Sequence, residues 1–201
     1  MLQQKNLEEA KRVAYASIVT DASQRLANLV TNILKLNKLE NQQIYPKAEI
    51  YDLGEQLCSC MLVFEKVWEE KQIDIETGID DNVLVDADAE LLELVWNNLL
   101  SNAFKFTAPG GKVALSLYTE ADCAVVEVRD TGCGIAPETG KHIFEKFYQG
   151  DISHVAQGNG LGLALVKRVV DIIGGDIFIS SQLGKGSVFT VKLGRKQNDT
   201  A

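Results

Sequence analysis

The sequence predicts an α+β protein: a two-layer α/β sandwich, with helices on one face of a mainly antiparallel sheet, preceded by a long N-terminal helix. Apolar residues recur at three- and four-residue spacing in residues 1–41, 53–71 and 87–107, which is the helical period. Shorter segments alternate apolar and polar residues, the period of a half-buried strand. Glycine-rich turns separate these segments in the second half of the chain. This order of elements indicates a layered domain.

The composition is that of a globular protein. The chain has 201 residues, 46% of them hydrophobic and 24% charged, which suits one sizeable domain and an appendage. Its net charge of −8 argues against a nucleic-acid partner. Because we find no long apolar run and no signal peptide, we expect a cytoplasmic chain, which leaves a membrane-anchored parent protein open. The cysteines lack metal-site spacing, so we expect reduced thiols at Cys58, Cys60, Cys123 and Cys133.

The N-terminal helix carries a seam of apolar residues with alternating steps of four and three. The seam consists of Tyr15, Val19, Ala22, Leu26, Leu29, Ile33 and Leu36. No proline or glycine interrupts the helix before Pro46. Such a seam cannot bury itself, so we expect it to pack either on a helix of another subunit or on the domain that follows.

The remaining elements show the same two periods. We expect strands at residues 48–51, 73–76, 83–85, 113–118, 124–128, 177–180 and 187–193. We expect helices at residues 53–71, 87–107, 137–147 and 161–173. Asp52 can cap the first of these helices, and Gly174 with Gly175 stops the last. A polar tail ends the chain.

The helix at residues 87–107 is largely apolar on every side, so we expect it to be buried, with Asp86 or Asp88 as its cap. Asn98, Asn102 and Lys105 nevertheless project from one face of it. Amide oxygens suit Mg²⁺, and a lysine suits a phosphate. The face is therefore either a site for a charged ligand or a structural hydrogen-bond network.

Three glycine runs follow this helix. They are Asp130-Thr-Gly-Cys-Gly134-Ile135 after a strand, Gly158-Asn-Gly160-Leu161-Gly162-Leu163 at a helix start, and Gly184-Lys-Gly186-Ser187 between strands. Glycine allows close backbone approach, and a helix start can aim its N–H groups at phosphate. Each run alone is most often a turn.

The ordered set of motifs is more specific. The asparagine helix, the three glycine runs and Ile143-Phe-Glu-Lys-Phe147 between the first two runs resemble the ATP-binding domain of sensor histidine kinases. That domain belongs to the gyrase, heat-shock chaperone, histidine kinase and MutL superfamily and has the Bergerat-type fold. The resemblance divides the chain into part of the dimerisation and phosphoacceptor hairpin (1–45), an ATP-binding catalytic domain (46–195) and a tail (196–201).

The resemblance implies a role for each motif residue. Asp130 would accept a hydrogen bond from the adenine amino group, and Ser187 would hold a water or the adenine edge. Asn102, assisted by Asn98, would bind Mg²⁺, and Lys105 would contact phosphate. Phe106 would pack near the base or in the core. The other predicted nucleotide-binding residues are Ile135, Leu161 and the glycines Gly132, Gly134, Gly158, Gly160 and Gly162.

Three features of the sequence shape the expected activity. The only histidines are His142 and His154, so the phosphoacceptor of the hairpin is missing, and the expected lid at residues 148–157 has no Arg or Lys. Asn98 stands where the ATP-hydrolysing relatives place a glutamate, and an amide is no general base. We therefore expect transfer of the ATP γ-phosphoryl to a histidine outside this chain, then to a response regulator, in a homodimer joined through the N-terminal helix. We expect little activity from this chain alone.

Two other functions stay open. An anti-sigma-factor-type serine kinase shares the ATP-binding fold, although the seam of the N-terminal helix disfavours it. A nucleotide-dependent interaction module without transfer activity would suit the missing histidine and the lid without Arg or Lys.

Overall fold

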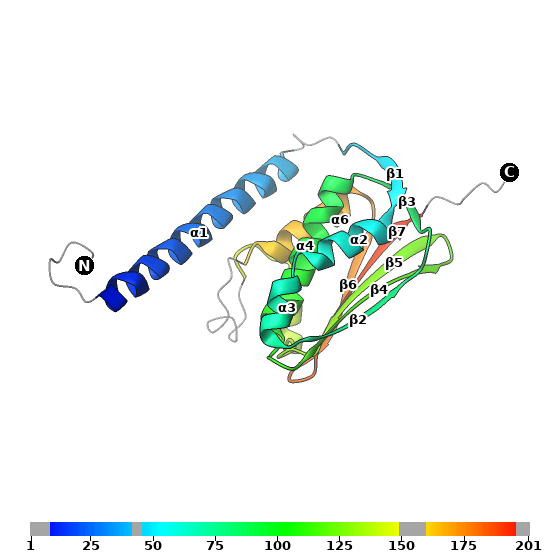
Figure 1. Cartoon of the computed structure of the whole chain (residues 1–201). Helices are drawn as coiled ribbons and strands as arrows, with labels where there is room; N and C mark the ends of the chain where they lie inside the picture. The colour runs from blue at the N-terminus through cyan, green and yellow to red at the C-terminus, as the bar shows by residue number, and fades with distance from the viewer. Residues whose placement is uncertain (1–8, 42–45, 149–159, 196–201) are drawn as a thin grey trace.

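The computed structural model describes residues 9–41, 46–148 and 160–195. Helix α1 (Glu9–Glu40) projects from a domain made of a helical layer and a main sheet (Figure 1). No helix in these ranges is long and apolar enough to cross a membrane.

Five strands form the main sheet, in the order β2-β4-β5-β7-β6. Their bounds are β2 Asp74–Ile79, β4 Lys112–Glu120, β5 Cys123–Asp130, β6 Asp176–Gln182 and β7 Gly186–Gly194. Only β2 and β4 pair in parallel, and the other three pairs are antiparallel. A separate antiparallel pair joins β1 (Glu49–Asp52) to β3 (Leu84–Ala87).

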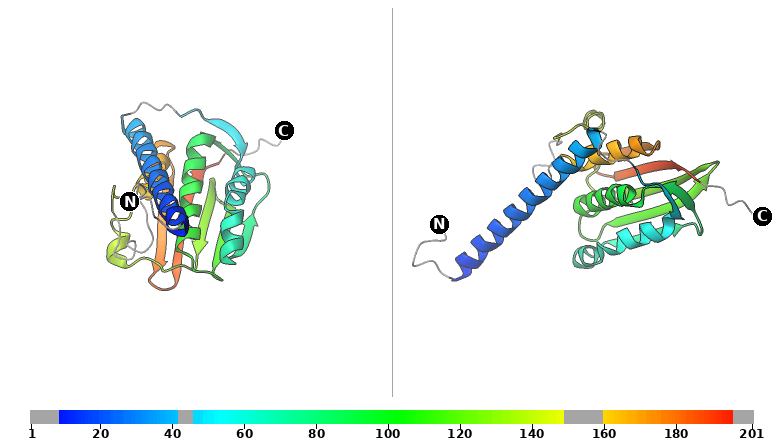
Figure 2. Two further views of the ribbon diagram at one scale, coloured as in Figure 1. Left: turned by 60° about the vertical axis from the view of Figure 1, so that its left-hand side comes forward. Right: turned by 90° about the horizontal axis from the view of Figure 1, so that it is seen from above.

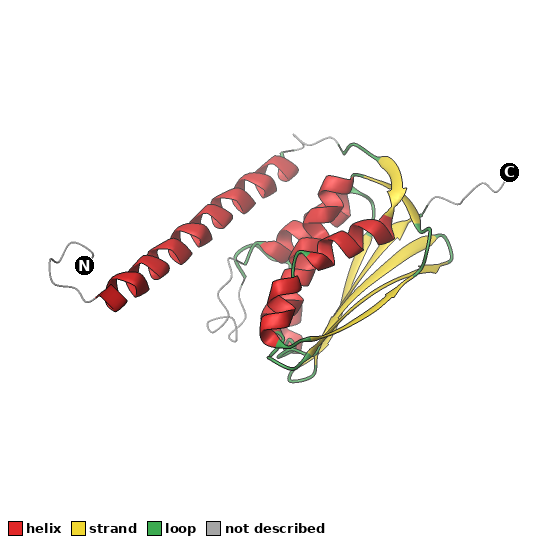
Figure 3. Cartoon of the chain, in the orientation of Figure 1, coloured by secondary structure: helices red, strands yellow, loops and turns green. Residues whose placement is uncertain are grey.

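The helices lie on one face of the main sheet (Figure 3). They are α2 (Leu53–Leu62), α3 (Glu65–Lys71), α4 (Ala89–Phe106), the single turn α5 (Pro137–Gly140) and α6 (Gly162–Ile172). α4 is central, because it packs on α2, α6 and β5. The prediction of helices on one face of a mainly antiparallel sheet is confirmed.

The core fills the space between the two layers. Val113, Leu115 and Leu117 of β4 point toward the helices and are fully buried, because alternate residues of a strand face the same side. Trp96 and Leu100 of α4 belong to the same core cluster and are fully buried as well. Burial of side chains this large fixes how α4 is rotated.

Side chains at both ends define the length of α4. At the start, the Asp88 carboxylate accepts hydrogen bonds from Leu91 N (3.0 Å) and Lys47 N (2.8 Å). Of the two predicted caps, Asp88 is therefore the one the structure uses. At the end, the backbone N and the Oγ1 of Thr107 donate to Ala103 O at 3.1 and 2.7 Å.

Two predicted helices are shorter than expected. The helix predicted at 53–71 is divided into α2 and α3 at Val63 and Phe64. The break lets Phe64 stack on Phe104 at 5.2 Å between ring centroids, so tertiary packing overrides helical propensity. The helix predicted at 137–147 ends at Gly140, a poor helix former, and continues as turns.

α1 divides into a packed end and an open remainder. Its C-terminal end lies beside α6 (Figure 2), where Leu36 and Leu39 are buried and Arg168 Nη2 donates to Leu39 O at 3.0 Å. Most of the remaining seam is exposed, including Val19 (51%) and Leu26 (61%). Contact with the following domain thus accounts for only part of the predicted seam.

We expect Asp88→Ala to destabilise the domain by about 1–2 kcal/mol, because it removes the cap of the central helix and an acceptor for Lys47 N. Chemical denaturation followed by circular dichroism measures the loss. Asp81→Ala, in the exposed turn before β3, is the matched control. Equal stability of the two variants would contradict the capping role.

Candidate functional site

Four segments that are distant in sequence meet at one end of the helical layer. The β5–β7 register places Asp130 opposite Ser187, which brings the first glycine run next to the third. α4 packs on both β5 and α6, so its polar face lies near the second run. The structure thus gathers the predicted motifs.

Asp130 is a buried carboxylate, 7% exposed, at the end of β5. Its Oδ1 accepts a hydrogen bond from Gly132 N at 2.8 Å. Burial raises the pKa of Asp130, and backbone hydrogen bonds from Gly132 and Ser187 partly oppose that rise. An additional donor would stabilise this carboxylate in its charged form.

The backbone around Gly134 is too close to β6 for any side chain. Gly134 has a φ of +66°, and a Cβ added there would lie 2.0 Å from Gln182 O. Only glycine fits this conformation and this contact. The first glycine run is therefore held against the end of β6.

Ser181, in β6, is a site residue that the sequence analysis missed. Its Oγ accepts from Ile135 N (2.8 Å), lies 2.9 Å from Gly186 O and lies 3.0 Å from Ser187 Oγ. It thus joins the first glycine run to the third. A single serine that points inward from a strand belongs to no sequence motif. Only the alternation of exposed and half-buried positions in β6 could have indicated that Ser181 faces the site.

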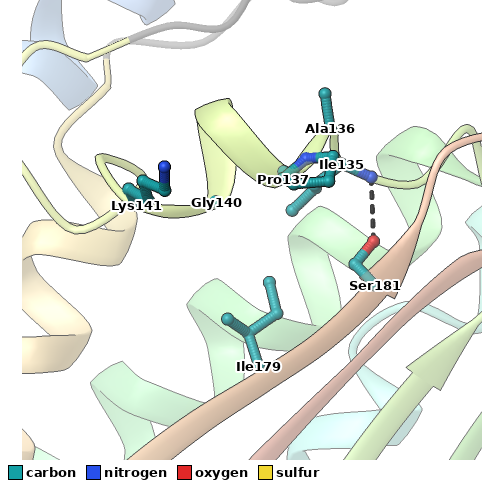
Figure 4. Close-up of a pocket in the computed structure, with 7 residues that line it drawn as sticks. All are labelled: Ile135, Ala136, Pro137, Gly140, Lys141, Ile179 and Ser181. Atoms are coloured by element: carbon teal, nitrogen blue, oxygen red, sulfur yellow. Dashed lines mark hydrogen bonds between the residues drawn. The ribbon is translucent and has the colours of Figure 1, made fainter.

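A hollow of about 250 Å³ opens beside Ser181 (Figure 4). Its lining comprises Ile135, Ala136, Pro137, Gly140, Lys141, Ile179 and Ser181. Ile135, one of the predicted nucleotide-binding residues, is half-buried in its wall. Asp130 and Ser187 do not line the hollow, although Ser187 Oγ lies 3.0 Å from the Ser181 Oγ in its wall.

The polar face of α4 lies opposite the start of α6. Asn98, Asn102 and Lys105 are all half-buried. Asn98 Nδ2 donates to Leu94 O at 2.7 Å, and a Cβ added to Gly162 would lie 2.7 Å from Asn98 Oδ1. Glycine at position 162 thus lets the first turn of α6 approach the amide oxygen of Asn98.

Lys105 lies over the ring of Phe106, with Nζ 4.7 Å from the ring centroid. Burial lowers the pKa of Lys105, so a nearby anion would favour its charged form. Phe106 is half-buried, whereas its neighbour Phe104 is 1% exposed and stacks in the core. Phe104 therefore occupies the core position that was one of the two predicted alternatives for Phe106.

The start of α6 is suited to an anion. Gly162 is its first residue, and Leu161 before it is 1% exposed and makes no side-chain cap hydrogen bond. Gly160 O accepts from Phe147 N at 2.8 Å, which anchors the segment in front of the helix. The N–H groups at a helix start favour phosphate. Gly158, His154 and most of the predicted lid lie outside the described residues.

Lys71 is a second residue that the sequence analysis missed. From the end of α3 it donates to three backbone carbonyls at the end of α4. Backbone acceptors leave no trace in a side-chain pattern, so no sequence motif indicates this contact.

Comparisons with known proteins agree with this geometry. The family model described as histidine kinase-, DNA gyrase B- and HSP90-like ATPase matches residues 87–197. The chain is 36% identical over 182 residues to the circadian input-output histidine kinase CikA of Synechococcus elongatus, covering 88% of this chain and 24% of that protein. It is 33% identical over 173 residues to the sensor histidine kinase RppB of Synechocystis, covering 84% and 38%. The chain therefore spans well under half of these relatives.

Two solved structures are similar over almost the whole chain. Full-length ShkA in complex with AMPPNP has a TM-score of 0.81 and 27% identity, covering 98% of this chain and 41% of that one. The histidine kinase AdeS of Acinetobacter baumannii has a TM-score of 0.76 and 25% identity, covering 96% and 87%. Together with the family match over more than half of the residues, they lead to one conclusion: the chain belongs to the histidine kinase-, DNA gyrase B- and HSP90-like ATPase family, as an ATP-binding catalytic domain of the histidine kinase type.

Proposed function

We propose that this chain binds ATP with Mg²⁺ and transfers the γ-phosphoryl group to a histidine outside its 201 residues, within a two-component sensor kinase. The proposal rests on one observation. The buried carboxylate of Asp130 and the polar face of α4 converge with the start of α6, where the N-cap residue Leu161 has no capping side chain. An acceptor for a base amino group, a cation and the N–H groups of a helix start suit the parts of a nucleotide.

Asp130 and the residues around it would hold the base. The carboxylate has spare acceptor capacity beyond its bond to Gly132 N, so it can accept from the adenine amino group. Ser187, 6% exposed and 3.0 Å from Ser181, would present a hydroxyl to the adenine edge or a water. Ile135 and Phe106 would supply apolar contacts to the ring.

Lys105 and the first turn of α6 would hold the phosphates. Gly160, Leu161 and Gly162 contribute backbone groups there, and the positive end of the helix favours negative charge. Asn102 would bind Mg²⁺ through its amide oxygen, assisted by Asn98, and the ion would neutralise phosphate charge. The described residues contain no group of three or more His, Cys, Asp or Glu that could hold a metal ion, so amides and phosphates fit this metal better than a protein cage.

The environment of Asn98 favours transfer over hydrolysis. Its amide nitrogen already donates to Leu94 O, and an amide cannot take a proton from water. Phosphoryl transfer then depends on positioning and charge neutralisation. His142, the histidine within the described ranges, is exposed and lies 2.7 Å from Glu145 Oε1. Its partner is therefore a sequence neighbour and not a residue of the polar face of α4.

We infer a cytoplasmic homodimer that phosphorylates a response regulator. The exposed seam of α1 in front of Leu29 offers the apolar surface for a second copy. This surface also distinguishes the chain from a single-domain serine kinase. The net charge of −8 gives no support for a nucleic-acid partner.

We expect calorimetric titration to detect binding of ATP and of ADP in the presence of Mg²⁺. The affinity should fall when EDTA removes the metal, because the phosphates then lose their link to Asn102. Absence of binding for both nucleotides, with folded protein at high concentration, would contradict the proposal.

We expect Asp130→Asn to weaken nucleotide binding by about 1–3 kcal/mol. The loss should be similar for ATP, ADP and a non-hydrolysable analogue, because Asp130 contacts the base. Titration of each ligand measures it, with Asp81→Asn as an exposed control. A loss confined to ATP would place Asp130 at the phosphates instead.

The same substitution should not lower the stability of the nucleotide-free chain at neutral pH. Burial raises the folded-state pKa of Asp130 above its unfolded value. The stabilisation by this group is therefore present at low pH and is lost as pH rises through the folded pKa. Melting curves from pH 4 to 8 should show that the melting temperature of the variant rises relative to that of the wild type as the pH increases. The opposite trend would show that the two backbone bonds outweigh burial.

We expect this chain alone neither to phosphorylate itself nor to hydrolyse ATP quickly. With labelled ATP, label should reach only a separately added phosphoacceptor hairpin from the same parent protein. His142→Ala should leave that transfer unchanged. Acid-labile label on the isolated chain would show that the chain carries its own acceptor histidine. Binding of ATP without transfer to the hairpin would favour an interaction module.

A further inference from the structure

The side chain of Lys71 reaches from α3 to the end of α4. Its Nζ donates to Phe104 O at 2.6 Å, to Thr107 O at 3.0 Å and to Lys105 O at 3.3 Å. One ammonium group thus uses its three donors on three carbonyls of a single turn. Lys71 is half-buried, so water competes weakly for these bonds.

These carbonyls need a partner because the last turn of a helix leaves its C=O groups without intrahelical donors. Thr107 already supplies both of its donors to Ala103 O. Lys71 provides the donors for the next carbonyls and adds positive charge at the negative end of the helix. Lys71 is therefore the C-terminal cap of α4, supplied by another helix.

The same turn carries residues of the nucleotide site. Lys105 and Phe106 belong to it, and a Cβ added to Gly132 would lie 2.6 Å from Phe106 O. Gly132 N in turn donates to Asp130. A continuous series of contacts therefore runs from Lys71 through the last turn of α4 to the carboxylate at the base position.

The backbone of α3 supports this arrangement. Lys71 O accepts from Gly110 N at 2.9 Å, which fastens the turn after α4. Phe64 and Trp68 contact the ring of Phe104 at 5.2 and 5.9 Å. Their packing holds α3 in place, so the stem of Lys71 starts from a fixed position.

We propose that Lys71 is a positioning residue of the nucleotide site: its ammonium group holds the last turn of α4 so that Lys105 and Phe106 meet phosphate and base. The proposal rests on the proposed binding of ATP. Without the ammonium group, the carbonyls of Phe104, Lys105 and Thr107 turn toward water. The turn then loosens and displaces the side chains it carries.

The test compares Lys71→Met with Lys66→Met. Methionine keeps an unbranched stem and removes the charge and all three donors. Lys66 lies on the same helix with its side chain 86% exposed, 3.8 Å from Glu70, so its substitution makes the same change in net charge away from α4. Calorimetry measures the affinity for Mg²⁺-ADP and Mg²⁺-ATP at a temperature where circular dichroism shows both variants to be folded.

We expect Lys71→Met to bind both nucleotides about tenfold more weakly than the wild type, and Lys66→Met to bind like the wild type. A lower melting temperature with unchanged affinity would overturn the proposal, because Lys71 would then be a structural cap alone. If Lys71→Met does not fold, Lys71→Gln replaces it. Glutamine has two N–H donors for three carbonyls, and wild-type affinity in that variant would equally overturn the proposal. Failure of the wild type itself to bind would instead contradict the proposed function.

Discussion

The burial of α4 is the constraint on which the site depends. Trp96, Leu99 and Leu100 are at most 1% exposed, and rotating the helix would bring all three into water at a cost of several kcal/mol. That rotation also fixes the direction of residues 98, 102 and 105, because they share one half-buried face of the helix. The polar face is thus placed by apolar packing rather than by its own contacts.

The site carries an electrostatic cost in the free protein. Burial raises the pKa of Asp130 and lowers that of Lys105, so both charged forms are disfavoured where they stand. Each charged group has a different neighbour: the Gly132 N–H donates to Asp130, and Lys105 lies over the Phe106 ring. A ligand with an amino donor at one end and phosphate at the other would relieve both costs. Charged groups that are buried in this way strengthen the binding of a ligand and lower the stability of the ligand-free domain.

The sequence predicted those parts of the fold that repeat a side-chain period. The strands, the apolar surface of α4 and the polar face of Asn98 and Lys105 follow from spacing alone. The break between α2 and α3 could not be predicted from spacing, because it depends on the stacking of Phe64 on Phe104, which is distant in the sequence. Ser181 and Lys71 were missed for a related reason: both act on backbone groups far along the chain, and backbone groups are the same at every residue. Motifs identified the glycine runs, whereas the contacts that hold them together required the structure.

The apolar seam of α1 is divided between a buried part and an exposed part. Leu36 is buried in the domain core and Leu29 packs against it, while Val19 and Leu26 remain more than half exposed. The bond from Arg168 to Leu39 O and the contact of Lys146 with Glu40 at 2.5 Å fix this end of the helix. A second copy that packed along the seam would meet it mainly in front of Leu29, because Leu29 and Leu36 already contact the nucleotide domain. A partner that took the whole seam would have to displace the domain from α1, and the two contacts would then compete for the same leucines.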